Sequence, residues 1–219
     1  MAMNSINKSS STPSFLGLDT PARVFQKRCQ DWADLPALRH KKHGLWQTVT
    51  WHQYYQHAQS VGLALLNLGL RQGDGVCVLA ENRPEWLYVD MAAQCLGMVG
   101  NGIYPTSSPK QLQHILLDSG TRVLFVENQE QLDKVLEVSE DCPELQHIVV
   151  MEREGLREFM HSKVSFFDDF LKQGEALVAT QATLFEKGIA ETRSDALACL
   201  VYTSGTTGAP KGAMSWNSN

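Results

Sequence analysis

Between residues 73 and 151 the chain alternates short apolar stretches with amphipathic segments, and this alternation is the strongest constraint on its fold. The apolar stretches predict strands, which we place at residues 76–80, 99–104, 123–126 and 145–151. The segments between them predict helices at about residues 84–96, 109–119 and 129–138. Strands that alternate with helices build βα units around a mostly parallel sheet. We therefore predict an α/β fold with a helix-flanked, mostly parallel β-sheet.

The flanking regions are less uniform. Thr20 followed by Pro21 predicts the start of a first helix, whose apolar stripe is Phe25, Cys29 and Trp32. Residues 36–40 and 45–50 predict a hairpin, and the capping pattern of Thr50 with Gln53 predicts a long helix after it. A further helix cap is predicted at Asn82. Residues 152–193 are polar and contain three glycines, so we expect surface helices and connections there, with a short helix near residues 168–172.

A run rich in glycine and hydroxyl side chains follows a short apolar stretch, residues 197–201, near the C-terminal end. It reads Tyr202-Thr203-Ser204-Gly205-Thr206-Thr207-Gly208-Ala209-Pro210-Lys211-Gly212. Glycines allow successive backbone N–H groups to face one concavity, hydroxyl groups add donors, and lysine adds a positive charge. A flexible linker is the alternative, but the preceding strand and the closing lysine favour a loop that binds polyphosphate.

The spacing excludes a Walker loop. With Gly205 as its first glycine, that motif needs glycine at position 210 and serine or threonine at position 212, where this chain has Pro210 and Gly212. Pro210 also disfavours the helical conformation at Ala209. We therefore predict strand, loop, strand.

The run resembles the phosphate-loop signature of the adenylate-forming superfamily, which includes acyl-CoA synthetases, luciferases and peptide-synthetase adenylation domains. In that family the loop holds the phosphates of ATP. The resemblance implies that seven residues here bind the nucleotide phosphates: Thr203, Ser204, Gly205, Thr206, Thr207, Gly208 and Lys211. It assigns no catalytic residue and no metal ligand within this chain.

Three other segments resemble long-chain acyl-CoA synthetases in particular. They are Asn82-Arg83-Pro84-Glu85-Trp86, Gly102-Ile103-Tyr104-Pro105-Thr106-Ser107-Ser108 and Val126-Glu127-Asn128. The resemblance implies that ATP activates a fatty acid as an acyl-adenylate and that coenzyme A then accepts the acyl group, with Mg²⁺ as a further cofactor. Two alternatives stay open. One is a noncatalytic binding or regulatory module that retains the fold, and the other is adenylation of a different carboxylic acid for a carrier protein or other acceptor.

The resemblance also sets the expected boundaries. Residues 1–18 are expected to be a disordered tail, and residues 19–219 the N-terminal part of an AMP-binding domain that is truncated after the phosphate loop. The segments for adenine, ribose and magnesium are expected outside this chain, so we expect an incomplete and inactive fragment. The second strand of the loop is expected to be nearly unbuilt.

Composition limits the partners and the compartment. The net charge of −5, with no basic cluster carrying interleaved aromatics, argues against a nucleic-acid partner. The five cysteines are scattered, which is typical of a reducing compartment. No apolar run reaches the length of about 18 residues that a membrane span needs. We expect a cytoplasmic protein, with peripheral contact with a membrane left open.

Overall fold

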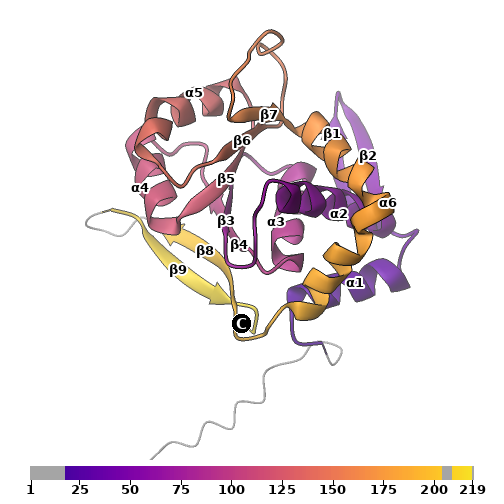
Figure 1. The fold of residues 1–219 in the computed structure, drawn as a ribbon. Helices are drawn as coiled ribbons and strands as arrows, with labels where there is room; N and C mark the ends of the chain where they lie inside the picture. Colours follow the sequence, from indigo (N-terminus) through magenta and orange to yellow (C-terminus); the bar gives the residue numbers. More distant parts are fainter. Residues whose placement is uncertain (1–17, 204–208, 219) are drawn as a thin grey trace, which may run out of the picture.

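The structure, a computed structural model, describes residues 18–203 and 209–218. These residues form a seven-stranded sheet in the order β7-β6-β5-β3-β4-β8-β9 and a separate two-stranded sheet, β1-β2 (Figure 1). The strands are β1 Pro36–Lys42, β2 Leu45–Thr50, β3 Gly75–Leu79, β4 Val99–Ile103, β5 Thr121–Val126, β6 His147–Val150, β7 Val164–Phe166, β8 Leu197–Thr203 and β9 Lys211–Trp216. The helices are α1 Pro21–Asp31, α2 Trp51–Asn67, α3 Pro84–Cys95, α4 Pro109–Ser119, α5 Gln129–Val138 and α6 Phe167–Glu191, with a short 3₁₀ turn at Ser139–Asp141.

The predicted α/β fold with a mostly parallel sheet is confirmed. Every pairing in the large sheet is parallel except that of β8 with β9. All five residues of β3 are buried. Val76 and Val78 face one apolar cluster, whereas Cys77 and Leu79 face the other. Such a strand, apolar on both sides, requires a helical layer on each face of the sheet.

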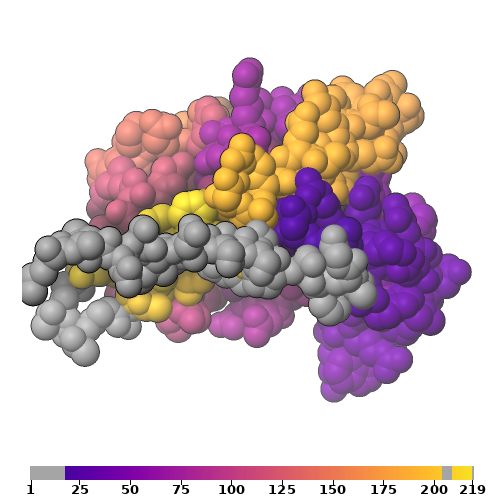
Figure 2. All heavy atoms as spheres, turned by 90° about the horizontal axis from the view of Figure 1, so that it is seen from below, coloured from indigo at the N-terminus to yellow at the C-terminus, as the bar shows by residue number. Residues whose placement is uncertain are grey.

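The two helical layers divide along the chain. The first cluster takes its helical residues from α1, α2, α3 and α6, and the second takes them from α4 and α5. Figure 1 shows α6 beside α1 and α2 on one side, with α4 and α5 on the other. The view from below in Figure 2 agrees, since the orange α6 again lies against the indigo and purple segments, away from the pink ones.

Several helix starts follow their sequence signals, and others do not. The Thr50–Gln53 capping box is present, Ser108 and Gln111 form a second, and Thr20 caps α1. The predicted cap at Asn82 is wrong. Arg83 occupies the N-cap position of α3, and its side chain makes no capping hydrogen bond.

Trp32 also differs from its prediction. It follows α1 and is 40% exposed. Its ring lies against Trp51 and beneath the Arg28 guanidinium group, so it covers the end of the helix instead of joining the buried stripe.

The region from residue 152 to 193 holds the largest error of the sequence analysis. The short helix near residues 168–172 is part of the 25-residue helix α6, and the strand β7 precedes it. Gly174 and Gly188 do not end this helix, and both lie within α6. At each of them a neighbouring segment approaches the α6 backbone closely. A Cβ atom on Gly174 would lie 1.8 Å from the Ser60 carbonyl oxygen of α2, and one on Gly188 would lie 2.6 Å from a methyl group of Leu96.

The second strand of the phosphate loop is fully formed, so the expectation of an unbuilt strand is wrong. β9 has six residues and pairs with β8 from Thr203↔Lys211 to Leu197↔Trp216. The residue after it, Asn217, is also fixed: its backbone N–H donates to Ala196 O at 3.0 Å, and its amide donates to Arg193 O at 2.8 Å. Backbone pairing with β8 therefore extends along the whole of β9.

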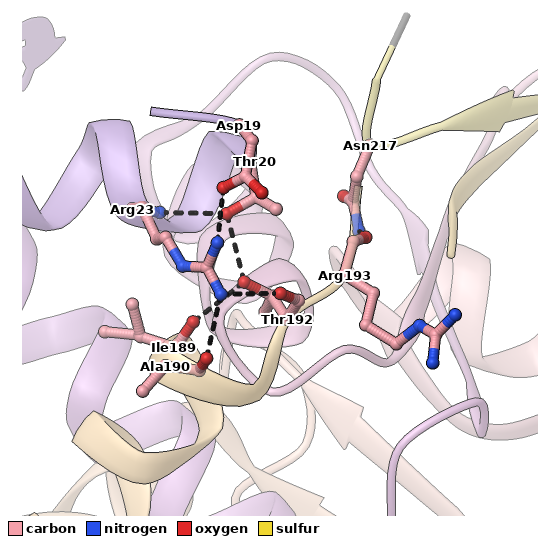
Figure 3. Close-up of polar contacts among 8 residues, drawn as sticks. All are labelled: Asp19, Thr20, Arg23, Ile189, Ala190, Thr192, Arg193 and Asn217. Carbon is pink, nitrogen blue, oxygen red and sulfur yellow. Dashed lines mark hydrogen bonds and ion pairs between the residues drawn. The ribbon is translucent and has the colours of Figure 1, made fainter. Parts of the chain in front are cut away.

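A polar cluster joins the start of α1 to the end of α6 (Figure 3). The Arg23 guanidinium group donates to Ala190 O at 2.8 Å and to Thr192 O at 2.9 Å, and the Thr20 and Thr192 hydroxyl oxygens lie 3.0 Å apart. A cation at the C-terminal end of a helix satisfies its free carbonyl groups and complements the helix dipole. The cluster thus fixes the point at which the chain leaves α6 for β8.

Replacement of Gly174 by alanine tests the contact between α2 and α6. In a freely accessible helix, this change stabilises by up to about 1 kcal/mol through helix propensity. Here the added methyl group collides with backbone, so we expect a net loss of about 1–3 kcal/mol in the free energy of unfolding. Urea denaturation measures it, with the exposed neighbour change Gln173→Ala as the control, expected within about 0.5 kcal/mol of wild type. A Gly174→Ala variant more stable than wild type would contradict the close approach.

Candidate functional site

The carboxyl ends of β4 and β8 define the candidate site. β4 ends at Ile103 and β8 at Thr203, at the same edge of the sheet, because the two strands are parallel neighbours. The chain leaves β3 for α3 on one face and leaves β4 for α4 on the other. In open α/β sheets, ligands bind in the crevice outside the carboxyl ends of the strands where the connections change face.

A hollow of about 390 Å³ lies at this edge. Polar side chains reach it from the segment after β4, from the first turn of α4 and from the end of β8. Its lining residues are Gly102, Ile103, Tyr104, Thr106, Ser107, Gln111, Ile115, Tyr202, Thr203 and Pro210. The hollow therefore lies between α4 and the ends of β4 and β8, with Pro210 at its border.

Two of the seven predicted phosphate-binding residues fall within the described part of the chain. Thr203 is the last residue of β8 and Lys211 the first of β9; both are exposed, and they are register partners across the two strands. The other five, Ser204, Gly205, Thr206, Thr207 and Gly208, lie outside the described residues. Their role in phosphate binding stays a prediction.

Sequence reasoning missed two residues of α4 that contact the flanks of the loop. The Tyr202 hydroxyl group donates to Asp118 Oδ2 at 2.6 Å, and His114 Nε2 lies 2.9 Å from Pro210 O. Burial, and then the hydrogen bond to Asp118, raise the pKa of Tyr202 well above its usual range, so the phenol remains a donor. The spacing of four residues between His114 and Asp118 was visible in the sequence and places both on one helix face, but it does not reveal their partners.

The other end of the same sheet edge is acidic. Arg83 lies between the carboxyl ends of β3, β5 and β6, with Glu85 at 2.9 Å, Glu127 at 3.6 Å and Glu152 at 2.9 Å. Three carboxylates around one guanidinium group leave a net negative charge. Polyphosphate is therefore repelled here, whereas Lys211 supplies a positive charge at the β8–β9 end.

A second hollow, of about 510 Å³, lies between α3 and β8 on the other face of β4. Gly100 and Gly102 make room here for side chains of α3. A Cβ atom on Gly102 would lie 2.9 Å from the Trp86 ring, and one on Gly100 would lie 3.2 Å from Asp90 Oδ1. The Gln94 amide donates to the other Asp90 oxygen at 2.8 Å, and burial raises the pKa of Asp90 from 3.8 to about 6.

The comparisons with known proteins agree with this geometry. The family model described as AMP-binding enzyme matches residues 25–219. The chain therefore belongs to the AMP-binding enzyme family, which confirms the resemblance drawn from the loop.

Its curated relatives are fatty acid ligases. The chain is 34% identical over 196 residues to the long-chain-fatty-acid–CoA ligase ACSBG1 of Homo sapiens, and 33% identical over 201 residues to ACSBG2 of Rattus norvegicus. The matches cover 89% and 90% of this chain but 26% and 30% of the two relatives. The chain thus spans less than a third of the length of these relatives.

Solved structures show the same fold. The chain resembles the anthranilate CoA ligase AuaEII in complex with anthranoyl-AMP, with a TM-score of 0.75 and 30% identity over 91% of this chain and 35% of that one. It also resembles VinN with 3-methylaspartate, with a TM-score of 0.66 and 20% identity over 90% of this chain and 47% of that one. In the described part of this chain, no helix combines the length and apolarity needed to span a membrane.

Replacement of Asp90 by asparagine tests the second hollow. A carboxyl group whose pKa is about 6 when folded and 3.8 when unfolded holds more protons in the folded state. Its ionisation therefore lowers the stability of the fold as the pH rises from about 4 to 6. Asparagine keeps an acceptor for Gln94 without a charge, so we expect Asp90→Asn to gain about 2 kcal/mol at pH 7 and little at pH 4.

Urea denaturation at both pH values measures this difference. The control is Asp133→Asn, at an exposed position of α5 that does not line the hollow. An equal effect of Asp90→Asn at pH 4 and pH 7 would contradict a buried carboxylate.

Proposed function

We propose that this chain supplies the phosphate-binding part of an ATP-dependent ligase that activates a fatty acid as an acyl-adenylate and then transfers the acyl group to coenzyme A. The observation that carries the proposal is the position of Thr203 and Lys211 at the β8–β9 end of the sheet edge, beside the hollow of about 390 Å³. The family match and the named fatty acid ligase relatives support it.

The chemistry explains why a cationic, donor-rich loop is needed. A carboxylate oxygen attacks the α-phosphorus of ATP, the bond from that phosphorus to the bridging oxygen of the β-phosphate breaks, and pyrophosphate leaves. The coenzyme A thiol then attacks the acyl carbonyl group, loses its proton, and AMP leaves. Both reactants of the first step are anions, so positioned positive charge and N–H or O–H donors lower its barrier.

In this proposal Lys211 neutralises phosphate charge and the Thr203 hydroxyl group donates to a phosphate oxygen. The residues of positions 204–208 supply backbone N–H groups and hydroxyl donors. In this proposal the contribution of the chain is to bind and orient the nucleotide. Magnesium is implied by the resemblance, but the described residues contain no group of three His, Cys, Asp or Glu side chains that could hold it. We therefore assign no step to it.

The choice of a fatty acid rests on the relatives. The two named ligases act on long-chain fatty acids, whereas the similar structure AuaEII is an anthranilate CoA ligase. Adenylation of another carboxylic acid is therefore the second candidate, and substrate profiling of an intact parent enzyme separates the two. A cytoplasmic location, with peripheral membrane contact left open, belongs to the same proposal.

Replacement of Lys211 by alanine tests the phosphate grip in the 219-residue chain. Without a complete nucleotide pocket we expect weak ATP binding, in the millimolar range, since association costs offset a few contacts. Loss of one charge-assisted contact at an exposed site should weaken binding about tenfold. Titration calorimetry measures it, with Lys172→Ala, an exposed lysine on α6, as the control. Equal affinity of wild type and Lys211→Ala would contradict the assignment.

Turnover gives a second test. We propose that these residues alone do not complete adenylation, so the chain should show no fatty-acid-dependent exchange between pyrophosphate and ATP. If the wild-type chain catalysed this exchange and Lys211→Ala abolished it, the expected inactivity would be refuted, but the assignment of Lys211 to phosphate binding would be supported.

A further inference from the structure

Helix α4 contacts both flanks of the predicted phosphate loop with residues one turn apart. Asp118 accepts the hydroxyl hydrogen of Tyr202, which comes just before the loop, and His114 lies against the carbonyl oxygen of Pro210, which comes just after it. The residues that join the two flanks lie between positions 203 and 209. One rigid element therefore contacts the chain on both sides of this segment.

α4 is itself firmly held. Leu112, Ile115 and Leu116 are buried in the second apolar cluster, and the Ser108–Gln111 capping box fixes its first turn. Gly120, with φ of 59°, ends it. A helix fixed at both ends and along one face can define the position of a strand pair that contacts its other face.

The stability of the fold explains the hydrogen bond between Tyr202 and Asp118, but not the one between His114 and Pro210 O. Tyr202 is 7% exposed, so its hydroxyl group needs a partner to avoid the cost of a buried free donor. The bond of His114 to Pro210 O has no such explanation, because Pro210 is only partly buried and water could satisfy its carbonyl group. That bond reaches Pro210 on the far flank of the loop, one residue before the first register pair of β8 and β9, Thr203↔Lys211.

We propose that His114 and Asp118 are positioning residues that hold the two flanks of the loop at the separation needed to bind polyphosphate. The part of this proposal that concerns polyphosphate binding rests on the proposed function. The bracing itself does not, and it can be tested without any nucleotide. Through Gln111, which lines the 390 Å³ hollow, the same helix also borders the site where the phosphates would lie.

Hydrogen–deuterium exchange of the 219-residue chain, without ligand, tests the bracing. We expect amides in the peptide from residue 203 to 212 to exchange about two- to tenfold faster in His114→Ala and in Tyr202→Phe, the range for loss of one net hydrogen bond. His114→Gln, whose amide can still donate, should restore protection. The matched control is Gln113→Ala, which removes the hydrogen bond from α4 to Asp141 without removing a hydrogen bond to Tyr202 or Pro210.

Binding of inorganic tripolyphosphate gives the functional readout. His114→Ala should weaken it by the same two- to tenfold factor, with a melting temperature like that of Gln113→Ala, and His114→Gln should recover it. Unchanged exchange in both His114→Ala and Tyr202→Phe would overturn the proposal. Faster exchange in Gln113→Ala as well would also overturn it, because the effect would then be general loosening of α4. If wild type binds no tripolyphosphate while the exchange pattern holds, the bracing stands and the proposed function fails.

Discussion

Burial of the parallel strands on both faces is the constraint on which this structure depends. β3 is fully buried, and its side chains alternate between two apolar clusters, so neither helical layer can be omitted. In the layer of α1, α2, α3 and α6, the backbones of α2 and α6 lie in close contact at Gly174. Because the central strands are parallel, their carboxyl ends lie at one edge of the sheet, from which the predicted functional loops leave.

Charge divides this edge into two parts. The ends of β3, β5 and β6 meet the carboxylates around Arg83, which fix the entry to α3 and disfavour anions. The ends of β4 and β8 meet Lys211, the hollow of about 390 Å³ and the first turn of α4. An anionic nucleotide is therefore favoured at only one end of the edge, and that is where the family signature lies in sequence.

The sequence predicted the central βα units well because their main signals are local. Each strand is a buried apolar stretch, and α4 also has a capping box at Ser108 and a closing glycine, Gly120. The strand at residues 197–201 was also accessible in this way, and β8 extends to Thr203. Residues 204–208 of the predicted loop lie outside the described residues. The length of α6 could not be predicted in this way. Glycine disfavours a helix by propensity, and the close contacts of Gly174 with α2 and of Gly188 with Leu96 are visible only in the structure.

The candidate site shows the same limit. Thr203 and Lys211 were found from composition and spacing, since a phosphate loop has a recognisable pattern. His114 and Asp118 were not, because their partners lie 96 and 84 residues away and only the tertiary fold brings them together. β9 was underestimated because its stability comes from pairing with β8, which a short polar segment does not reveal.

The central claim is that polyphosphate binds at the β8–β9 end of the sheet edge, and amide chemical-shift mapping tests it most directly. Inorganic tripolyphosphate is titrated into the isotopically labelled 219-residue chain. We expect saturable shifts for the amides of Thr203, Lys211 and Gly212 and for the first turn of α4, with little change around Arg83 and Glu127. Saturable shifts centred on Arg83, or none near Thr203 and Lys211, would contradict it.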